Sequence, residues 1–138
     1  MIRAVLDTNV YVSALVFGGK PAALIRLAEV GAFQVVVSQE ICQELIETLT
    51  SKFNWPKLQA HRACWELWRK SEWVIPPELI RASRDPDDDV ILACALASKA
   101  TVIVTGDHGL LSLHPFRGIA ILPPAAFIAR LLGKSAGP

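Results

Sequence analysis

The stretch Ile2-Arg3-Ala4-Val5-Leu6-Asp7-Thr8-Asn9 decides the fold of this chain. Residues 2–6 form a short apolar run that predicts a buried, central β-strand, and an acid, Asp7, follows it directly. Residues 8–16 then predict a helix, which the pair Gly18-Gly19 would end. A buried strand followed by an acid and a helix is typical of an α/β domain.

Strands and helices alternate along the rest of the chain. Further strands are predicted at residues 33–37, 73–75, 101–105 and 119–122, the last at a sheet edge. Further helices are predicted at residues 22–30, 39–51, 55–71, 90–99 and 108–113, with a short one after Pro123-Pro124. This alternation predicts the α/β class, with a mostly parallel central sheet of four or five strands flanked by helices. Because no repeat or linker divides it, we expect one domain over residues 1–138, with 134–138 as a frayed tail.

Composition places the chain among globular proteins. Hydrophobic residues make up 52% and charged residues 20% of its 138 residues, and the mean hydropathy is positive. This length allows one sizeable core, and the hydrophobic content argues against a disordered chain. The longest apolar runs are far shorter than the roughly 20 residues of a membrane span, and no export signal is visible. We therefore expect no association with a membrane.

Charge and cysteine content narrow the possible functions. The net charge of +1 gives no overall basic field, so any affinity for nucleic acid must come from a local patch. The three cysteines, Cys42, Cys64 and Cys94, are odd in number and widely spaced, and no zinc-binding pattern is present. We expect them to be small buried hydrophobic side chains in a protein of the reducing cytoplasm.

Acidic residues stand where predicted strands end or helices begin. They are Asp7, Glu44, the run Asp85-Pro86-Asp87-Asp88-Asp89, and Asp107. Each has an ordinary explanation alone: Asp7 or Asp107 as a helix cap, Glu44 as a solvated side chain, and the run as acids favoured by a helix dipole. Together, however, they would meet at the end of a parallel sheet where ligands bind.

Converging acids without matching Lys or Arg residues repel one another, and a divalent cation is the commonest reason to tolerate this. Carboxylate oxygens favour Mg²⁺ or Mn²⁺, and Zn²⁺ is disfavoured because His108 and His114 are the only histidines nearby. Such a metal lowers the pKa of a bound water and neutralises charge on a phosphodiester. The pattern therefore predicts a metal-dependent phosphodiesterase, with RNA as the favoured substrate. Asn9 would orient Asp7 or a bound water, or else be an ordinary turn residue.

These residues resemble a PIN-domain nuclease. The resemblance rests on Val5-Leu6-Asp7-Thr8-Asn9, Val37-Ser38-Gln39-Glu40-Ile41-Cys42-Gln43-Glu44-Leu45, Asp85-Pro86-Asp87-Asp88-Asp89 and Val104-Thr105-Gly106-Asp107. Within that superfamily the chain is most similar to the VapC-type toxin components of type II toxin–antitoxin pairs. The resemblance implies a three-layer, Rossmann-like fold and a Mg²⁺- or Mn²⁺-dependent endoribonuclease. It also implies a homodimer or higher oligomer that a co-encoded antitoxin protein neutralises.

The resemblance also implies roles for single residues. Carried over by position, the four catalytic metal ligands are Asp7, Glu44, Asp88 and Asp107. The family motif selects Asp88 as the third ligand, whereas the distance to Asp107 along the chain would select Asp89. We favour Asp88, with Asp85 as a helper and Asp89 as the alternative metal ligand. Thr105 resembles the threonine that precedes the last acid by two residues.

Aromatic and basic residues gather in the middle of the chain. The tryptophans are Trp55, Trp65, Trp68 and Trp73, and the basic residues among them are Lys52, Lys57, Arg62, Arg69 and Lys70. Trp65 and Trp68 are three residues apart on a predicted helix, which favours core or dimer packing over base stacking. We expect this region to be a partner interface whose basic residues contact the RNA backbone. Arg81 and Arg84, beside the acidic run, are alternative phosphate contacts, and His61 is expected on the surface.

Two other functions fit parts of the pattern. A haloacid-dehalogenase-like phosphatase also places an acid after its first strand, but it needs a second Asp two residues later, where this chain has Asn9. A catalytically inactive or regulatory Mg²⁺-binding α/β module would need only the acidic cluster. That alternative predicts metal binding without cleavage.

Overall fold

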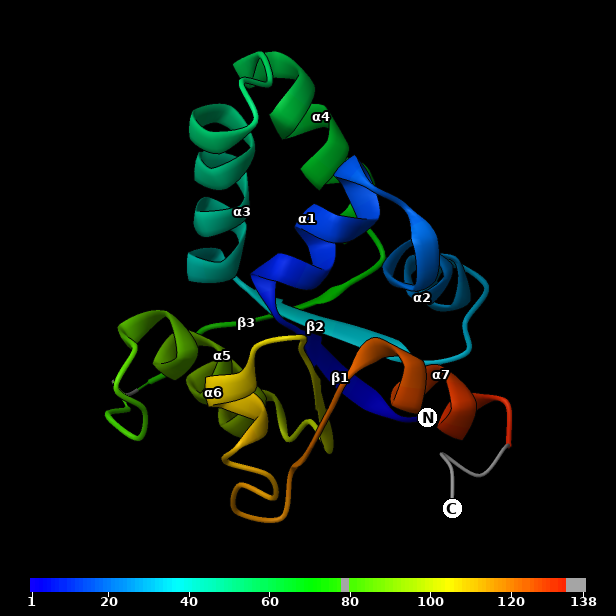
Figure 1. The fold of residues 1–138 in the computed structure, drawn as a ribbon, viewed down its shortest axis with the longest axis vertical. Helices are drawn as coiled ribbons and strands as arrows, with labels where there is room; N and C mark the ends of the chain where they lie inside the picture. The colour runs from blue at the N-terminus through cyan, green and yellow to red at the C-terminus, as the bar shows by residue number, and fades with distance from the viewer. Residues whose placement is uncertain (78–79, 134–138) are drawn as a thin grey trace.

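A computed structural model describes residues 1–77 and 80–133 (Figure 1). Over these residues the chain forms five strands and seven helices. The strands are β1 (Arg3–Leu6), β2 (Gln34–Ser38), β3 (Glu72–Val74), β4 (Val102–Val104) and β5 (Ala120–Leu122). The helices are α1 (Thr8–Val16), α2 (Gly19–Glu29), α3 (Gln39–Lys52), α4 (Lys57–Trp68), α5 (Pro86–Ser98), α6 (His108–Leu111) and α7 (Pro124–Leu131). The tail expected at 134–138 lies outside the described residues.

The five strands form one sheet in the order β3-β2-β1-β4-β5. Every neighbouring pair is parallel, so the prediction of a mostly parallel α/β sheet is confirmed, with β5 at an edge as expected. In Figure 1, α1 to α4 lie on one side of the sheet and α5 on the other, while α7 packs against α2. Helices, sheet and helices thus form the three layers that the resemblance implied (Figure 1). The order reverses at β1, which lies between β2 and β4, and open α/β sheets bind ligands at such a reversal.

The central strands are apolar apart from residues at their ends, because both faces of the sheet are covered. Ala4, Val5 and Leu6 of β1 are fully buried, as are Ile103 and Val104 of β4. Continuous apolar runs of this kind are typical of strands in a parallel sheet between two helical layers. The opening stretch of the sequence therefore lies at the centre of the core, as predicted.

Four predicted helices differ from the observed ones by two or more residues at an end. The helix expected at 22–30 begins at Gly19, and the one expected at 108–113 ends at Leu111. The helix expected at 90–99 begins at Pro86 instead, because Asp85 caps it by accepting a hydrogen bond from the Asp87 N–H at 2.9 Å. The acids at 87–89 therefore form its first turn. The helix expected at 55–71 is the shorter α4, which starts only after Pro56 and ends at Trp68.

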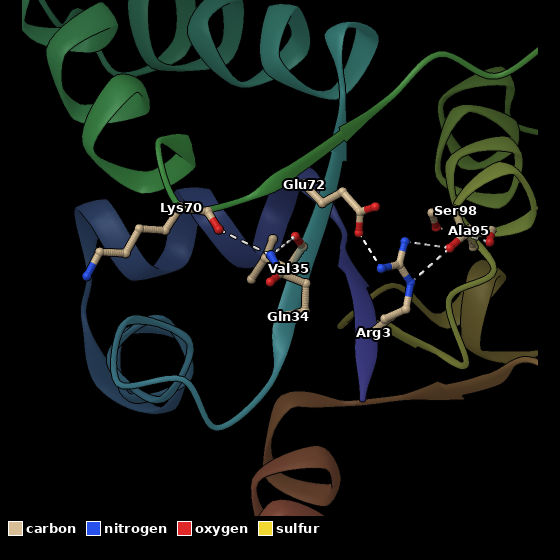
Figure 2. Close-up of polar contacts among 7 residues, drawn as sticks. All are labelled: Arg3, Gln34, Val35, Lys70, Glu72, Ala95 and Ser98. Carbon is tan, nitrogen blue, oxygen red and sulfur yellow. Dashed lines mark hydrogen bonds and ion pairs between the residues drawn. The ribbon is translucent and has the colours of Figure 1, made fainter. Parts of the chain in front are cut away.

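The amino ends of the strands meet at one edge of the sheet, which we call the amino edge. There Arg3 donates from Nε and Nη2 to the backbone carbonyl of Ser98 at 3.0 and 2.8 Å, and it forms an ion pair with Glu72 (Figure 2). Beside it, Gln34 donates from Nε2 to the carbonyl of Lys70 at 3.2 Å. These contacts join β1 to the end of α5 and β2 to the segment before β3.

Two sequence-based expectations concern side-chain burial and membranes. Cys42, Cys64 and Cys94 are all buried and unbonded, which confirms that they serve as small core side chains.

No single helix within the described residues is long and apolar enough to cross a membrane. Only α1 and α2 taken together reach the necessary length and composition, and they meet at 103°.

Candidate active site

The carboxyl ends of the strands meet at the opposite edge of the sheet, which we call the carboxyl edge. Asp7 follows β1 directly, and Asp107 follows β4 after a two-residue turn. A single hydroxyl links the two positions: Thr105 donates from Oγ1 to Asp7 Oδ2 at 2.7 Å and accepts from the Asp107 N–H at 3.0 Å. The parallel pairing of β1 with β4 therefore brings together two acids from opposite ends of the sequence.

Glu44 reaches this edge from α3. Ser38 ends β2 and caps α3 by accepting from the Ile41 N–H, so the helix starts at the carboxyl edge. Ile41 and Leu45 face the core and leave Glu44 half-buried at the border of the apolar stripe. Its Oε2 accepts a hydrogen bond of 3.1 Å from the hydroxyl of Thr8, the residue after Asp7.

Asp88 approaches Asp107 from the other side of the sheet. Asp88 lies in the first turn of α5 with only 8% of its surface exposed, and it accepts a hydrogen bond of 3.1 Å from the Ser83 hydroxyl. A β-carbon added at Gly109 would lie 3.1 Å from Asp107 Oδ2 and 3.7 Å from Asp88 Oδ2. Oxygens of Asp88 and Asp107 therefore approach the same side of Gly109, where an added side chain would crowd Asp107.

Burial and mutual repulsion raise the pKa of three of these acids. Burial raises the pKa of Asp7, which is 8% exposed; the charge of Asp107 adds to the rise and the Thr105 hydroxyl opposes it. Burial also raises the pKa of Asp88 to about 6, with further contributions from Asp107, Asp85 and Asp7. The pKa of Glu44 rises through burial and the charges of Asp87 and Asp7. The four acids thus interact as one negatively charged group.

No Lys, Arg or His side chain within the described residues forms an ion pair with any of these acids. The ion pairs in that part of the chain are Arg3 with Glu72 at the amino edge and Arg69 with Glu66 on α4. The negative charge at the carboxyl edge is therefore not matched by an ion-paired protein cation over residues 1–77 and 80–133.

The donor chemistry of this group fits a hard divalent cation. All the available donors are carboxylate oxygens, which Mg²⁺ and Mn²⁺ prefer, and a bound cation would relieve the repulsion that raises the pKa values. In the described part of the chain, however, no three His, Cys, Asp or Glu side chains lie close enough to enclose one ion as they stand. An ion shared by the four acids would have to draw their side chains closer.

The other predicted site residues lie around this group. Asp85 is exposed and caps α5, and Asn9 is exposed in the first turn of α1. Asp89 is half-buried, and its Oδ1 accepts hydrogen bonds from the backbone N–H groups of Ala82 and Ser83 at 3.0 and 2.8 Å. Asp88 and Asp89 thus accept from different groups of Ser83, its hydroxyl and its backbone N–H.

Two residues at the site were missed from the sequence. Thr8 follows Asp7 directly in the motif Val5-Leu6-Asp7-Thr8-Asn9, and this position indicated that it lies near the site. Its hydrogen bond to Glu44 could not be predicted, because the two residues are 36 positions apart in the sequence. Ser83 carried no signal, because a serine in a polar loop is ordinary. Its contact with Asp88 depends on how that loop folds back over α5.

The tryptophan-rich region lies away from the four acids along the chain and has both buried and exposed members. Trp68 is buried and packs edge to face against Tyr11 and Trp73, with ring centroids 5.7 and 6.2 Å apart. Trp65, in contrast, is 67% exposed. The basic residues nearby are exposed, and so are Arg81, Arg84 and His61.

Comparisons with known proteins identify the family and a similar fold. The family model described as PIN domain matches residues 3–109, a range that includes all four acids. One chain of the crystal structure of VapBC2 from Rickettsia felis, bound to a DNA fragment from their promoter, has a similar fold with a TM-score of 0.63. The match covers 87% of this chain and 97% of that one, and the two sequences are 14% identical, so it shows the fold alone. No curated protein sequence matches this chain. Because the family model covers well over half of the chain, the protein belongs to the PIN domain family.

Proposed function

We propose that this protein is a metal-dependent endoribonuclease that hydrolyses phosphodiester bonds with Asp7, Glu44, Asp88 and Asp107. One observation carries the proposal: four acids on four separate elements gather at the strand-order reversal, without an ion-paired cation among the described residues. Structural carboxylates seldom accept such an arrangement, because neighbouring negative charges repel one another. Membership of the PIN domain family supports the same function.

The four acids would hold Mg²⁺ or Mn²⁺ through their carboxylate oxygens. When bound, such an ion lowers the pKa of water and neutralises charge that develops on a phosphate. The protein itself would orient the carboxylates through neighbouring hydroxyl groups. Thr105 holds Asp7, Thr8 holds Glu44 and Ser83 holds Asp88, each through a hydroxyl that donates to a single carboxylate oxygen. The other oxygen of each carboxylate is left for a ligand.

RNA would be held by basic side chains near these acids. Arg81 and Arg84 are exposed in the segment that leads into α5, next to Ser83 and Asp85. Contacts from such side chains to phosphate oxygens position a nucleic acid without reading its sequence. With a net charge of only +1, the protein would rely on this local contribution.

We further propose that the protein is the toxin of a type II toxin–antitoxin pair in the cytoplasm, and that it forms a homodimer or higher oligomer. The fold shared with a chain of VapBC2, and the motifs that resemble VapC-type toxins, support this assignment. The exposed apolar side chains Leu58, Trp65, Trp73 and Ile75 lie on α4, on β3 and just after it, where a protein partner would cover them.

A cleavage assay tests the nuclease. Purified protein is incubated with a fluorophore- and quencher-labelled RNA of mixed sequence in Mg²⁺, in Mn²⁺ and in excess EDTA. We expect cleavage with either metal and none in EDTA. Binding of Mn²⁺ without cleavage would favour the regulatory module, and release of phosphate from a small phosphomonoester without RNA cleavage would favour the phosphatase.

Induced expression tests the role as a toxin. Wild-type protein should arrest growth and leave a set of cleaved RNAs that sequencing of fragment ends identifies, and Asp7→Asn should do neither. Co-expression of the protein encoded by the neighbouring reading frame should restore growth. Cleavage in vitro without growth arrest in cells would contradict the toxin role but not the nuclease.

A further inference from the structure

Asp89 holds the segment that precedes α5. Its Oδ1 accepts two hydrogen bonds, from the N–H of Ala82 at 3.0 Å and from the N–H of Ser83 at 2.8 Å. Two consecutive backbone donors on one carboxylate oxygen fix both the position and the direction of the segment at that point. Asp89 thus fastens a stretch of chain with no regular secondary structure to the first turn of a helix.

The segment held in this way reaches the candidate active site through Ser83. The Ser83 hydroxyl donates to Asp88 Oδ2 at 3.1 Å and accepts from the Asp85 N–H at 3.2 Å. The backbone N–H and the hydroxyl of one serine therefore join Asp89, Asp88 and the helix cap. A shift of the Ser83 backbone would move the hydroxyl that orients Asp88.

Neighbouring residues on a helix point about 100° apart, so Asp88 and Asp89 reach different atoms of Ser83. Asp88 accepts from the hydroxyl and lies near Asp107 beside Gly109, whereas Asp89 accepts from the backbone N–H groups of residues 82–83. The two acids also differ in environment, since Asp88 is buried and Asp89 is half-buried. These differences in contacts and burial favour Asp88 over Asp89 as a metal ligand.

We propose that Asp89 is a positioning residue that holds Ser83 against Asp88, and that it is not a metal ligand. The proposal rests on the proposed function, because the effect of Asp89 on catalysis passes through Asp88. Partners that orient a metal ligand typically change metal affinity or activity about 10–100-fold when they are removed. Asp89 acts through an acceptor oxygen and not through its charge.

Asp89→Ala and Asp89→Asn separate the acceptor oxygen of Asp89 from its charge. Asn keeps an acceptor oxygen and loses the charge, whereas Ala loses both. We expect Asp89→Ala to speed amide hydrogen exchange at Ala82 and Ser83, to weaken Mn²⁺ binding by calorimetry about 10–100-fold, and to lower RNA cleavage to the same degree. Asp89→Asn should restore all three. Asp87→Ala is the charge control: it removes a charge from the same helical turn but no side-chain hydrogen bond among the described residues. Because the charge of Asp87 acts on Glu44, this control can change Mn²⁺ binding, but exchange at Ala82 and Ser83 should stay as in the wild type.

Ser83→Ala tests the second step. It keeps the backbone N–H that Asp89 binds, so Ala82 should remain protected from exchange while Mn²⁺ binding and cleavage fall. Equal losses of Mn²⁺ binding in Asp89→Asn and Asp89→Ala, with both amides still protected, would overturn the proposal and make Asp89 a ligand. Unchanged exchange in Asp89→Ala would also overturn it. If the wild type binds Mn²⁺ but cleaves no RNA, the proposed function fails, and the exchange and calorimetry results still decide the role of Asp89.

Discussion

Charged side chains are paired at the amino edge of the sheet and not ion-paired at the carboxyl edge, within the described residues. At the amino edge, Arg3 contacts both a carboxylate, Glu72, and a backbone carbonyl at the end of α5, so opposite charges are matched. At the carboxyl edge, Asp7 and the acids around it are held only by hydroxyl and N–H groups within the described residues. Charge at the first edge forms an ion pair that joins elements of the fold, whereas charge at the second is not ion-paired in the described part of the chain and, under the proposed function, would hold a metal ion. Four experiments break or sharpen this contrast.

The largest effect should follow from Asp7→Asn. The variant keeps an acceptor for Thr105 but removes one negative charge from the carboxyl edge. We expect the rate of RNA cleavage to fall by more than the roughly 10–100-fold that is typical of residues around a metal ligand. The metal-free variant should unfold at the same or a higher denaturant concentration, because a repelled charge is gone. Glu47→Gln, an exposed acid one turn beyond Glu44, is the control; full activity in Asp7→Asn would refute the site.

The next effect should come from Thr105→Val. The substitution preserves shape but leaves Asp7 Oδ2 and the Asp107 N–H without their shared hydroxyl. We expect cleavage to fall about 10–100-fold, and a higher Mg²⁺ concentration to be needed for half-maximal rate. Thr105→Ser should recover most of the rate. A loss that Thr105→Ser shares in full would point to packing of the methyl group instead.

Arg3→Met should affect stability and not chemistry. It keeps an aliphatic side chain but removes both donors to Ser98 and the partner of Glu72. Because the ion pair is partly exposed, most of the loss should come from the carbonyl contacts, about 1–2 kcal/mol in the free energy of unfolding. Urea unfolding measures it. The Mg²⁺ dependence of cleavage should stay unchanged, and a shifted dependence would show that the two edges are coupled.

The smallest effect should be a change of stability with pH in the metal-free protein. The pKa of Asp88 is about 6 in the folded state against an ordinary value of 3.8, so the folded state binds a proton more tightly than the unfolded state. Stability from this group should therefore rise as pH falls from 7 to 5, by about 1 kcal/mol. Urea unfolding in EDTA at both pH values, with Asp88→Asn subtracted, measures the effect. A wild type and a variant with the same pH dependence would contradict the raised pKa.

Much of the fold and of the candidate site follows from local patterns, and the rest depends on long-range packing. The apolar runs of β1 and β4 and the acid after each could be read from the sequence, because burial in a parallel sheet requires continuous apolar residues. The start of α5 could be read only in part: Pro86 and the acidic run are compatible with a helix start, but the acids interrupt the apolar pattern, which begins at Val90. The different partners of Asp88 and Asp89 could not be read, because these depend on the path of residues 82–83.

The strand order also determines when the acidic site can form during synthesis. β1 lies between β2 and β4, yet Thr105, which holds Asp7, comes 98 residues after it in the chain. A nascent chain that ends before β4 has Asp7 and Glu44 but lacks Thr105, Asp107 and one whole side of β1. Under the proposed function, the chain could therefore not cleave the RNA of its own ribosome or its messenger before β4 and Asp107 have been synthesised.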